Sequence, residues 1–290
     1  MEQVVYLDGS LLPRSRALIS PFDFGFLYGY GLFETMRAYG GRIFRLSRHL
    51  DRLHASMQAL GISAGGYNLK EACYDTVAAN SLSEARIRLT VSLGESEGLD
   101  PPAQPKITVF IVATKYRPPA GHVYATGYRA RTASIRRYSG SALSRLKSLN
   151  YLDSLLARSE ARREGADEAI LLNEKGFLCE GSTTNVFLIS GGALLTPPES
   201  AGCLPGITRE AVVGLACTLG IPVFERELSP DELSVADEVF LTNSLLEIMP
   251  VKDIDGKPIG CAGAKGAGQV TQRLMEAYRA LVAAEFTSLP

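Results

Sequence analysis

The amino-acid sequence predicts an α+β fold, in which short strands predominate and helices occur between them at irregular intervals. Two observations lead to this class. Many short runs with strand character end in Gly-containing turns such as Asp8-Gly9-Ser10 and Ser190-Gly191-Gly192. Helical periodicity is confined to a few longer segments, without the regular strand–helix alternation of a doubly wound parallel sheet. At 290 residues, the chain is long enough for two compact domains or one large one.

In the N-terminal third, two hairpins precede a pair of helices. Ser47 is a good helix cap, and apolar residues recur at helical spacing from Leu50 to Leu60, just before Gly61. The polar loop Gly94–Gln104 separates two further strands. The elements expected here are strands Val4–Leu7, Leu11–Leu12, Phe33–Ala38 and Arg42–Arg45, a helix from Ser47 to Gly61, helix Leu69–Ala79, and strands Ala85–Ser92 and Lys106–Thr114.

The run Pro118-Pro119-Ala120-Gly121 marks the best domain boundary, because Pro and Gly interrupt both helices and strands. We therefore expect a small N-terminal domain (residues 1–117), an interdomain linker (118–127) and a larger domain (128–290). The elements expected in the larger domain are strand Tyr128–Ile135, helix Tyr151–Arg163, strands Ala169–Leu172, Phe177–Cys179, Thr184–Ile189 and Ala193–Thr196, helix Ile207–Leu219, strand Val223–Leu228, a helical turn at Pro230–Leu233, strand Glu238–Thr242, strands that turn at Asp255-Gly256 within Val251–Ile259, and helix Gly268–Phe286.

The composition argues against several classes of partner. The net charge is −1 and the Lys and Arg residues form no block, so a nucleic-acid surface is unsupported. No apolar run reaches the roughly 18 residues of a membrane-spanning helix, and the N-terminus lacks a basic-then-apolar leader. The five cysteines are scattered without a C-x-x-C pair, which predicts reduced thiols in the core and no metal site. We expect a cytoplasmic protein.

Three short segments in the second half of the chain carry groups suited to chemistry on an amine. Lys147 lies in a mostly uncharged stretch, where loss of solvation favours a neutral amine that can bond with an aldehyde. Glu180 is expected at a strand end, where its carboxylate can pair with a ring nitrogen. Gly206 precedes a helix whose first N–H groups, at Ile207 and Thr208, can bind a phosphate. Each feature alone also fits a surface lysine, a solvated turn or ordinary helix capping.

The region from Glu180 to Arg209 resembles the signature of the class IV (fold-type IV) pyridoxal-phosphate family. That signature consists of Glu, small residues and Asn-hydrophobic-aromatic, then a later Thr, then Gly-hydrophobic-x-basic. It is filled here by Glu180, Asn185, Val186, Phe187, Thr196, Gly206, Ile207 and Arg209. The likeness extends over nearly the whole chain, from Asp8-Gly9 to Leu241–Val251. It implies a small N-terminal α/β domain, a larger C-terminal domain with a mixed, barrel-like sheet, pyridoxal 5'-phosphate bound between them, and a homodimer.

The resemblance also implies roles for individual residues. Lys147 matches the Schiff-base lysine and general base, Arg52 the phosphate arginine, and Glu180 the partner of the pyridine nitrogen. Tyr151 matches the tyrosine that binds the cofactor's phenolate oxygen in branched-chain aminotransferases. Positions around the phosphate or the substrate carboxylate are matched by Ile207, Thr208, Thr242, Asn243 and Ser244. Substrate positions are matched by Tyr28, Phe33, Thr35, Arg86 and Arg88, although both arginines could instead pair with surface acids.

Two reactions stay open at this level. One is transfer of an amino group between an amino acid or amine and a 2-oxo acid; the other is a 4-amino-4-deoxychorismate lyase, which releases pyruvate and 4-aminobenzoate. Phe33 resembles the branched-chain aminotransferases, whereas Thr35 and the run Thr242–Ile248 resemble the lyases. We expect an aminotransferase, with the lyase as the alternative. A binding protein that kept the fold without the chemistry would need none of Lys147, Glu180 and Arg52.

Overall fold

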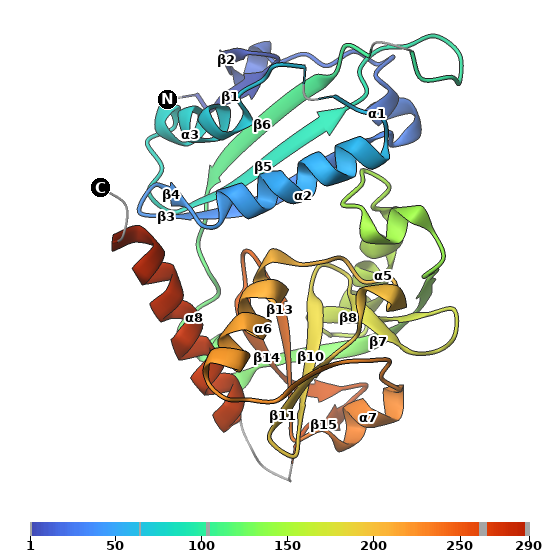
Figure 1. The fold of residues 1–290 in the computed structure, drawn as a ribbon, viewed down its shortest axis with the longest axis vertical. Coiled ribbons are helices and arrows are strands. Elements are labelled where there is room, and N and C mark those ends of the chain that lie inside the picture. The colour runs from blue at the N-terminus through green and yellow to red at the C-terminus, as the bar shows by residue number, and fades with distance from the viewer. Residues whose placement is uncertain (1, 64, 103–104, 261–265, 288–290) are drawn as a thin grey trace. The chain divides into compact units, whose positions relative to one another are not determined.

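The computed structural model describes residues 2–63, 65–102, 105–260 and 266–287. The chain divides into two compact units, whose helices and strands are labelled in Figure 1. Unit 1 comprises Met1–Arg117 and the short segment Leu146–Asn150, and unit 2 comprises Pro118–Arg145 and Tyr151–Pro290. The chain therefore returns to unit 1 for a few residues in the middle of unit 2. That short segment carries Lys147.

Unit 1 is built on a six-stranded sheet in the order β2-β1-β6-β5-β3-β4, with antiparallel neighbours throughout. The longest pairing joins β3 to β5 along eight residue pairs, from Gly31–Ser92 to Ala38–Ala85. The strands are β1 (Val4–Leu7), β2 (Ser10–Pro13), β3 (Gly31–Tyr39), β4 (Arg42–Ile43), β5 (Ala85–Ser92) and β6 (Thr108–Lys115). The helices are α1 (Phe24–Tyr28), α2 (Leu46–Ala59) and α3 (Leu69–Ala79), with a 3-10 turn at Arg14–Arg16.

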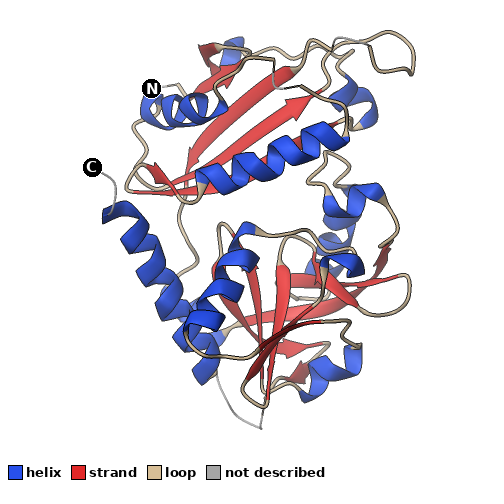
Figure 2. Ribbon diagram, viewed as in Figure 1, coloured by secondary structure: helices blue, strands red, loops and turns tan. Residues whose placement is uncertain are grey.

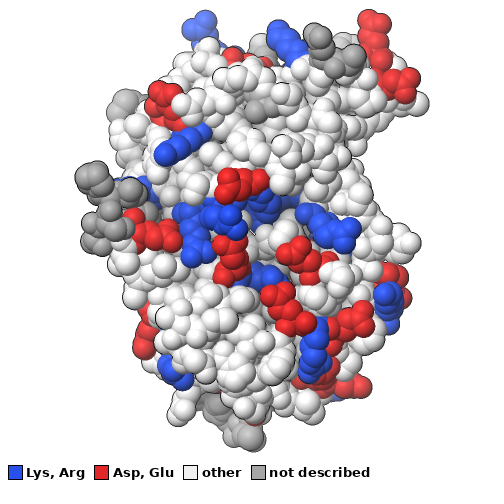
Figure 3. Space-filling model, viewed as in Figure 1, with Lys and Arg blue, Asp and Glu red and all other residues white. Residues whose placement is uncertain are grey.

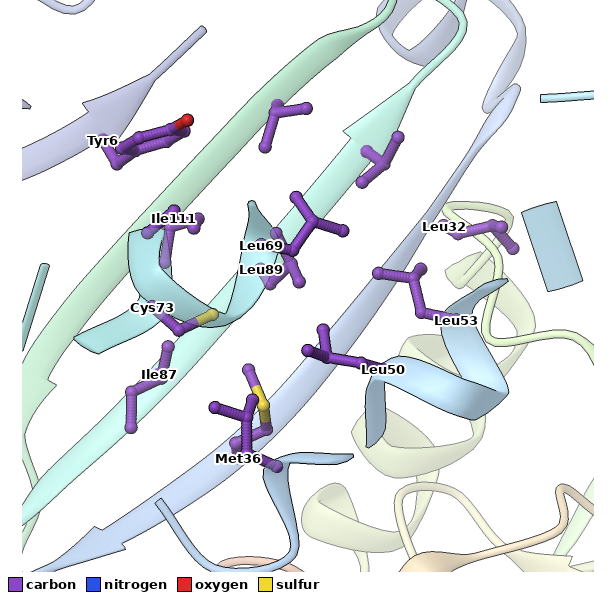
Figure 4. Close-up of a cluster of buried hydrophobic side chains, with 14 of the residues drawn as sticks. Tyr6, Leu32, Met36, Leu50, Leu53, Leu69, Cys73, Ile87, Leu89 and Ile111 are labelled. Atoms are coloured by element: carbon purple, nitrogen blue, oxygen red, sulfur yellow. The ribbon is translucent and has the colours of Figure 1, made fainter. Parts of the chain in front are cut away.

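Alternation along the strands gives this sheet one apolar face. In Figure 4, Ile87, Leu89 and Ile111 point toward Leu69 and Cys73 of α3, and the apolar residues of α2 extend the same cluster. Because successive side chains of a strand point to opposite faces, the residues between the apolar ones lie on the other face. That face receives Phe33 and Thr35 of β3 together with Arg86 and Arg88 of β5. The sheet thus separates the core from a polar face.

A buried carboxylate connects α1 to the sheet of unit 1. Asp23 is 1% exposed, and one of its oxygens accepts a hydrogen bond from Gly25 N at 2.7 Å, which caps the helix. Its other oxygen accepts from Ser92 Oγ at 2.8 Å and from Thr108 Oγ1 at 2.7 Å. Helix α1 was absent from the predicted elements, because a single turn has too little periodicity to detect in sequence.

Unit 2 contains a nine-stranded mixed sheet that curls into a barrel-like core (Figure 2). The hydrogen-bonded order is β12-β11-β10-β13-β14-β7-β8-β9, and β15 pairs with β14. Three of the pairs, β11–β12, β14–β7 and β7–β8, are parallel. The strands are β7 (Tyr128–Arg137), β8 (Glu168–Asn173), β9 (Leu178–Gly181), β10 (Asn185–Ser190), β11 (Ala193–Thr196), β12 (Val223–Glu225), β13 (Glu238–Asn243), β14 (Glu247–Ile254) and β15 (Lys257–Pro258).

The helices of unit 2 cover different parts of this sheet. Helix α5 packs on β7 and β8 through the small residues Ala157 and Ala161, whereas α6 and α8 pack on each other and on β13. The helices are α4 (Gly121–Thr126), α5 (Leu152–Arg163), α6 (Ile207–Thr218), α7 (Pro230–Val235) and α8 (Gln269–Thr287), with 3-10 turns at Ala142–Arg145 and Glu199–Ala201. Small residues on α5 bring that helix close to the strands that lead to Glu180.

The α+β class is confirmed, and several elements have the expected bounds, among them α3, β5 and β11. Three local expectations were wrong. Ser47 lies inside α2, which begins at Leu46 after Arg45, a residue with φ +50° and no capping hydrogen bond from its side chain. Strand β4 ends at Ile43, because the chain turns before that helix. Strand β12 ends at Glu225, so the predicted strand Val223–Leu228 is shorter than expected.

Two more differences concern the start of β14 and the stretch expected as a linker. Strand β14 begins at Glu247 and not at Val251, because Asn243 Oδ1 accepts from Leu245 N at 2.9 Å and from Leu246 N at 2.7 Å and closes the preceding turn. The stretch expected as a linker, residues 118–127, contains helix α4, which packs on β14. Local hydrogen bonds of this kind leave little periodic signal in a sequence.

Cys73, Cys179 and Cys203 are buried free thiols as expected, whereas Cys217 is exposed on α6. Burial raises the pKa of the Cys73 and Cys203 thiols to about 12. Cys261, and residues Ala103 and Gln104 of the predicted loop, lie outside the described residues. None of the described helices is long and apolar enough to cross a membrane. Acidic and basic side chains are interspersed on the face drawn in Figure 3.

Candidate active site

Backbone pairing places Lys147 beside β3 of unit 1. Phe33 N donates to Lys147 O at 2.8 Å, Leu149 N donates to Gly31 O at 2.9 Å, and Leu32 and Ser148 form an antiparallel bridge between these bonds. A Cβ atom on Gly31 would lie 2.7 Å from both Leu149 Cδ1 and Val91 O, so only glycine allows this close approach. The segment Leu146–Asn150 therefore acts as an extra strand at the edge of β3.

The Phe33 side chain brings two cations close to one ring. Lys147 Nζ lies 4.6 Å from the centre of the ring, and the guanidinium carbon of Arg88 lies 3.8 Å from it. A cation over an aromatic face is attracted by the ring's quadrupole. Thr35 lies directly opposite Arg88 in the β3–β5 register. Arg86 lies two pairs further along, opposite Arg37, and is exposed. Of the two predicted arginines, Arg88 is the one in contact with the Phe33 ring.

Arg52 belongs to a buried ion pair. The sequence did not predict the other two members of this cluster, Glu34 and His49. Arg52 Nε donates to Glu34 Oε1 at 2.9 Å, and Arg52 Nη2 donates to Glu34 Oε2 at 2.6 Å. His49 Nδ1 lies 2.7 Å from the same Oε2, and both Glu34 and His49 are about 1% exposed. His49 and Arg52 are three residues apart on α2, so they share the face that meets β3. This bidentate geometry fixes the guanidinium plane.

The protonation of this cluster follows from burial and charge. Burial alone would raise the pKa of Glu34, but the Arg52 guanidinium and the His49 hydrogen bond outweigh it and lower the pKa to about 2. Burial lowers the pKa of His49, and the charges of Arg52 and Lys147 lower it further, against the opposing effect of Glu34. At neutral pH the cluster therefore holds an ionised Glu34 and a neutral His49 that donates its Nδ1–H.

Tyr28 is the last residue of α1 and is 48% exposed. Its ring packs edge-on against Phe24, with 5.0 Å between ring centres. The next residue, Gly29, has φ +68°, and its carbonyl accepts from Asn150 Nδ2 at 3.0 Å. This bond ties the end of α1 to the segment that carries Lys147. Unit 1 therefore gathers Lys147, Phe33, Thr35 and Arg88 on β3 and its neighbours, binds Arg52 to the next residue of β3, Glu34, and places Tyr28 at the end of α1.

In unit 2, Glu180 lies on β9 and is 5% exposed. Arg137 Nε donates to its Oε1 at 3.1 Å, with a second bond from Arg137 Nη2, and Leu204 N donates to its Oε2 at 3.0 Å. Arg137 was not predicted, because it comes from the end of β7, far from Glu180 in sequence. These contacts fix the orientation of the buried carboxylate.

Helix α6 begins after a glycine. Any other residue at this position would force neighbouring atoms to move. Gly206 is the N-cap, and a Cβ atom there would lie 2.0 Å from Asn185 Oδ1. Asn185 Nδ2 donates to Leu204 O at 2.9 Å, which fixes the turn before the helix. The buried Ile207 and Thr208 then form the first turn of α6. Its backbone N–H groups have no partner inside the helix and carry the positive end of the helix dipole.

The remaining predicted residues lie around the loop that follows β9. Tyr151, just before α5, donates its hydroxyl to Ser182 O at 3.2 Å. Asn243, at the end of β13, donates Nδ2 to Thr183 O at 3.1 Å, and Ser244 follows it. Thr242 Oγ1 is buried and has no hydrogen-bond partner among the described residues. Within the described ranges no group of three or more His, Cys, Asp or Glu side chains could hold a metal ion.

Comparisons with known proteins identify relatives along nearly the entire chain. The family model for amino-transferase class IV matches residues 31–254. The putative branched-chain-amino-acid aminotransferase of Methanocaldococcus jannaschii is 41% identical over 279 residues, with 95% of each chain covered. The similarity therefore extends over most of the sequence and is not limited to the motifs.

Solved structures agree with the sequence relatives. The Escherichia coli branched-chain amino acid aminotransferase superposes with a TM-score of 0.91 at 34% identity, covering 97% of this chain and 95% of that one. The branched-chain amino acid aminotransferase of T.th., solved with pyridoxamine 5'-phosphate, gives 0.91 at 32% identity, covering 98% and 95%. The 4-amino-4-deoxychorismate lyase of Pseudomonas aeruginosa gives 0.85 at 30% identity, covering 95% and 98%.

These matches confirm the predicted fold type and the predicted kind of enzyme. The aminotransferase expectation is better supported than the lyase, because relatives at 41% and 35% identity are named branched-chain-amino-acid aminotransferases, whereas the lyase structure is 30% identical. This protein belongs to the class IV aminotransferases, enzymes that transfer an amino group with the help of pyridoxal phosphate.

Proposed function

We propose that this chain binds pyridoxal 5'-phosphate, with Lys147 as the covalently bonded amine, and exchanges amino groups between branched-chain amino acids and 2-oxo acids. One observation carries the proposal: consecutive residues of β3 contact an amine and two arginines. Phe33 meets Lys147 and Arg88, and Glu34 binds Arg52. One strand thus holds an amine and two anion-binding groups, which suits a cofactor with a phosphate and a substrate with a carboxylate. The branched-chain preference rests on the names of the relatives.

The residues of unit 2 fit the same cofactor. The first turn of α6 offers N–H groups to a phosphate, and the glycine before it leaves no side chain in the way. Thr242 Oγ1 is buried and lacks a partner in the described part of the chain, which a ligand atom would supply. The carboxylate of Glu180, held in place by Arg137, suits a ring nitrogen that carries a proton. We propose that Ile207, Thr208, Asn243 and Ser244 complete the phosphate and carboxylate contacts.

The residues then have separate tasks in the reaction. When bound, the cofactor supplies an electron sink for the charge left when the substrate α-proton departs. Lys147 Nζ moves that proton, and the Phe33 ring holds the Nζ when it is cationic. Glu180 would pair with the protonated pyridine nitrogen, and the Tyr151 hydroxyl, which Ser182 O positions, would contact the phenolate oxygen. Arg52 binds the phosphate in an orientation set by Glu34, and Arg88 binds the substrate carboxylate.

A 4-amino-4-deoxychorismate lyase is the second candidate because of Thr35. This residue lies opposite Arg88, next to the Phe33 ring on the same face of the sheet. A hydroxyl there could favour loss of a β-oxygen leaving group over return of the proton. The two outcomes share α-proton removal, so a difference of about 1.4 kcal/mol in one barrier changes their ratio tenfold. The 4-amino-4-deoxychorismate lyase of Pseudomonas aeruginosa is 30% identical to this chain, against 34% for the Escherichia coli aminotransferase.

We also propose that the protein is a homodimer. Helix α5 exposes Leu152, Leu155 and Leu156, which are spaced three and four residues apart on one face. Leu152 is 66% exposed, an unusual environment for a large apolar side chain in a helix that otherwise packs on the sheet. Exposed contiguous apolar side chains mark interaction surfaces. A second copy of the chain would cover this face.

The cysteines support a reducing compartment. Cys73, Cys179 and Cys203 are free and buried, so they are not arranged as a disulfide framework. We therefore propose a cytoplasmic location. Recovery of the protein from a secreted fraction during cell fractionation would contradict this location.

Replacement of Lys147 by alanine should lower the rate of amino-group transfer by roughly a thousandfold or more, because both the covalent link and the proton carrier are lost. Borohydride treatment of the wild-type protein with pyridoxal phosphate should fix the label on Lys147, as located by peptide mass spectrometry. Lys115→Ala, at the exposed end of β6, should change neither result. Recovery of the label on another lysine would refute the assignment.

Replacement of Glu34 by glutamine should destabilise the protein in a pH-dependent way. The pKa of Glu34 is lowered from 4.5 to about 2, so its ionised form stabilises the fold above about pH 4.5, and this contribution is lost as the pH falls toward 2. Urea unfolding should show that Glu34→Gln costs about 3 kcal/mol at pH 7 and little near pH 2.

The same Glu34→Gln protein should bind pyridoxal phosphate more weakly, since Arg52 loses its fixed orientation. Asp51→Asn on the exposed side of α2, where the Asp51 side chain is 64% exposed, serves as the control and should show neither effect. A loss of stability that stays the same from pH 7 to pH 2 would contradict the assigned charge state.

Substrate tests separate the two candidate reactions. Leucine, isoleucine or valine with 2-oxoglutarate should be turned over, and aminodeoxychorismate alone should release no pyruvate. Thr35→Gly should reduce any lyase activity at least about tenfold more than transamination if Thr35 steers elimination. Equal losses would mean that Thr35 only packs against its neighbours. Pyruvate release without any transamination of amino acids would reverse the order of the two candidates.

Sedimentation should give twice the mass of one chain for the wild-type protein. Replacing Leu152 and Leu155 together by aspartate should shift the protein to monomer, because two charges would be buried in the dimer. Val235→Asp serves as the control, since Val235 is 75% exposed on α7 of the same unit. A monomeric wild-type protein, or dimers that survive both aspartates, would exclude α5 as the interface.

A further inference from the structure

Unit 2 contains a buried carboxylate that has no part in the chemistry described so far. Glu168 is the first residue of β8, and its side chain is 1% exposed. An ionised carboxylate in such a place is costly unless hydrogen bonds and a countercharge compensate it. The groups around Glu168 supply both.

Three consecutive hydroxyl side chains donate to this one carboxylate. Thr183 Oγ1 lies 2.8 Å and Thr184 Oγ1 lies 3.5 Å from Glu168 Oε2, and Ser182 Oγ donates to Oε1. Ala169 N also donates to Oε1 at 2.9 Å, and Arg158 Nη1 lies 3.5 Å from Oε2. Because the three hydroxyls come from adjacent residues, the carboxylate restrains the whole Ser182–Thr184 loop.

The backbone of the same loop holds two residues of the candidate active site. Ser182 O accepts from the Tyr151 hydroxyl at 3.2 Å, and Thr183 O accepts from Asn243 Nδ2 at 3.1 Å. The loop is closed at its base, where Gly181 N donates to Thr184 O at 2.6 Å. It also follows Glu180 directly in the chain. The loop is thus bound on its side-chain side by Glu168 and on its carbonyl side by Tyr151 and Asn243.

We propose that Glu168 is a positioning residue for the cofactor, which acts through the Ser182–Thr184 loop on the Tyr151 hydroxyl and the Asn243 amide. This inference rests on the proposed function, because the placement of Tyr151 and Asn243 matters to the reaction only if pyridoxal phosphate binds. A glutamine at position 168 would keep the size of the side chain but lose its charge, and its amide would face the three hydroxyls as a donor. The loop would then lose its common acceptor.

Glu168→Gln should weaken the binding of pyridoxal phosphate about tenfold, as expected for the loss of hydrogen bonds to a charged group. The pH midpoint of the absorption band of the bound cofactor should move in the same direction as in Tyr151→Phe. If Glu168 acts through Tyr151, the double variant should have about the midpoint of Tyr151→Phe alone, which a double-mutant cycle measures.

Glu238→Gln provides a matched control in the same unit. Glu238 lies at the other end of β13 from Asn243, and it accepts from Val270 N at 3.0 Å and from Thr271 N at 2.7 Å at the start of α8. Its replacement should lower stability without changing cofactor affinity or the absorption midpoint. Should Glu168→Gln fail to fold, Ser182→Ala and Thr183→Val carry the test, each with a smaller shift in the same direction.

Unchanged affinity and midpoint in folded Glu168→Gln, or in both hydroxyl variants, would overturn the inference and leave Glu168 with a structural role only. Additive shifts in the double variant would also overturn it, because Glu168 would then act by another route. Failure of the proposed function is distinguishable, since the wild-type protein itself would then show no absorption band with pyridoxal phosphate. That result would overturn both.

Discussion

The pairing of Lys147–Leu149 with the edge of β3 is the constraint on which the active-site assignment depends. Two backbone hydrogen bonds, from Phe33 N to Lys147 O and from Leu149 N to Gly31 O, attach the segment Leu146–Asn150 to unit 1. Without this attachment Lys147 would belong to a loop between two parts of unit 2. With it, one β-bridge and two backbone hydrogen bonds hold the segment, and the amine lies 4.6 Å from the centre of the Phe33 ring. Rigid elements of this kind position reactive groups more precisely than loops do.

Buried charged side chains hold the polar groups of the candidate site in place. Glu34 fixes Arg52, Arg137 fixes Glu180, and Glu168 restrains the loop that binds Tyr151. Ionic groups are buried only where partners compensate the loss of water. In this protein each such group lies one contact away from a residue with a proposed role in catalysis. These buried charged groups therefore fix the orientation of the side chains at the candidate site.

Much of the fold could be predicted because its signals are local. The alternation of Ala85–Ser92, the helical period of Leu69–Ala79 and the Gly-containing turn before Ala193 each identify one element. The wrong expectations arose where a single side chain or backbone angle determines where an element begins. Arg45 begins α2 in a left-handed conformation, and Asn243 closes the turn before β14. Neither has a counterpart in a periodic pattern.

The motif residues of the candidate site could be predicted from the sequence, but the side chains that hold them in place could not. Lys147, Glu180 and Arg52 stand in recognisable segments, so a resemblance identifies them. Glu34 sits in a strand of mostly apolar residues, and Arg137 comes from a strand more than forty positions before its partner Glu180. Their importance follows only from contacts that folding creates. Glu34 and His49 could have been suspected from their place beside Phe33 and Arg52, but the bidentate geometry could not.

The central proposal is that Lys147 and Glu180 serve one cofactor. Hydrogen–deuterium exchange during a titration with pyridoxal phosphate tests it most directly. We predict that Leu146–Asn150 and α2 in unit 1, and the first turn of α6 in unit 2, become protected together with a single midpoint. Protection confined to one unit, or two separate midpoints, would contradict the proposal.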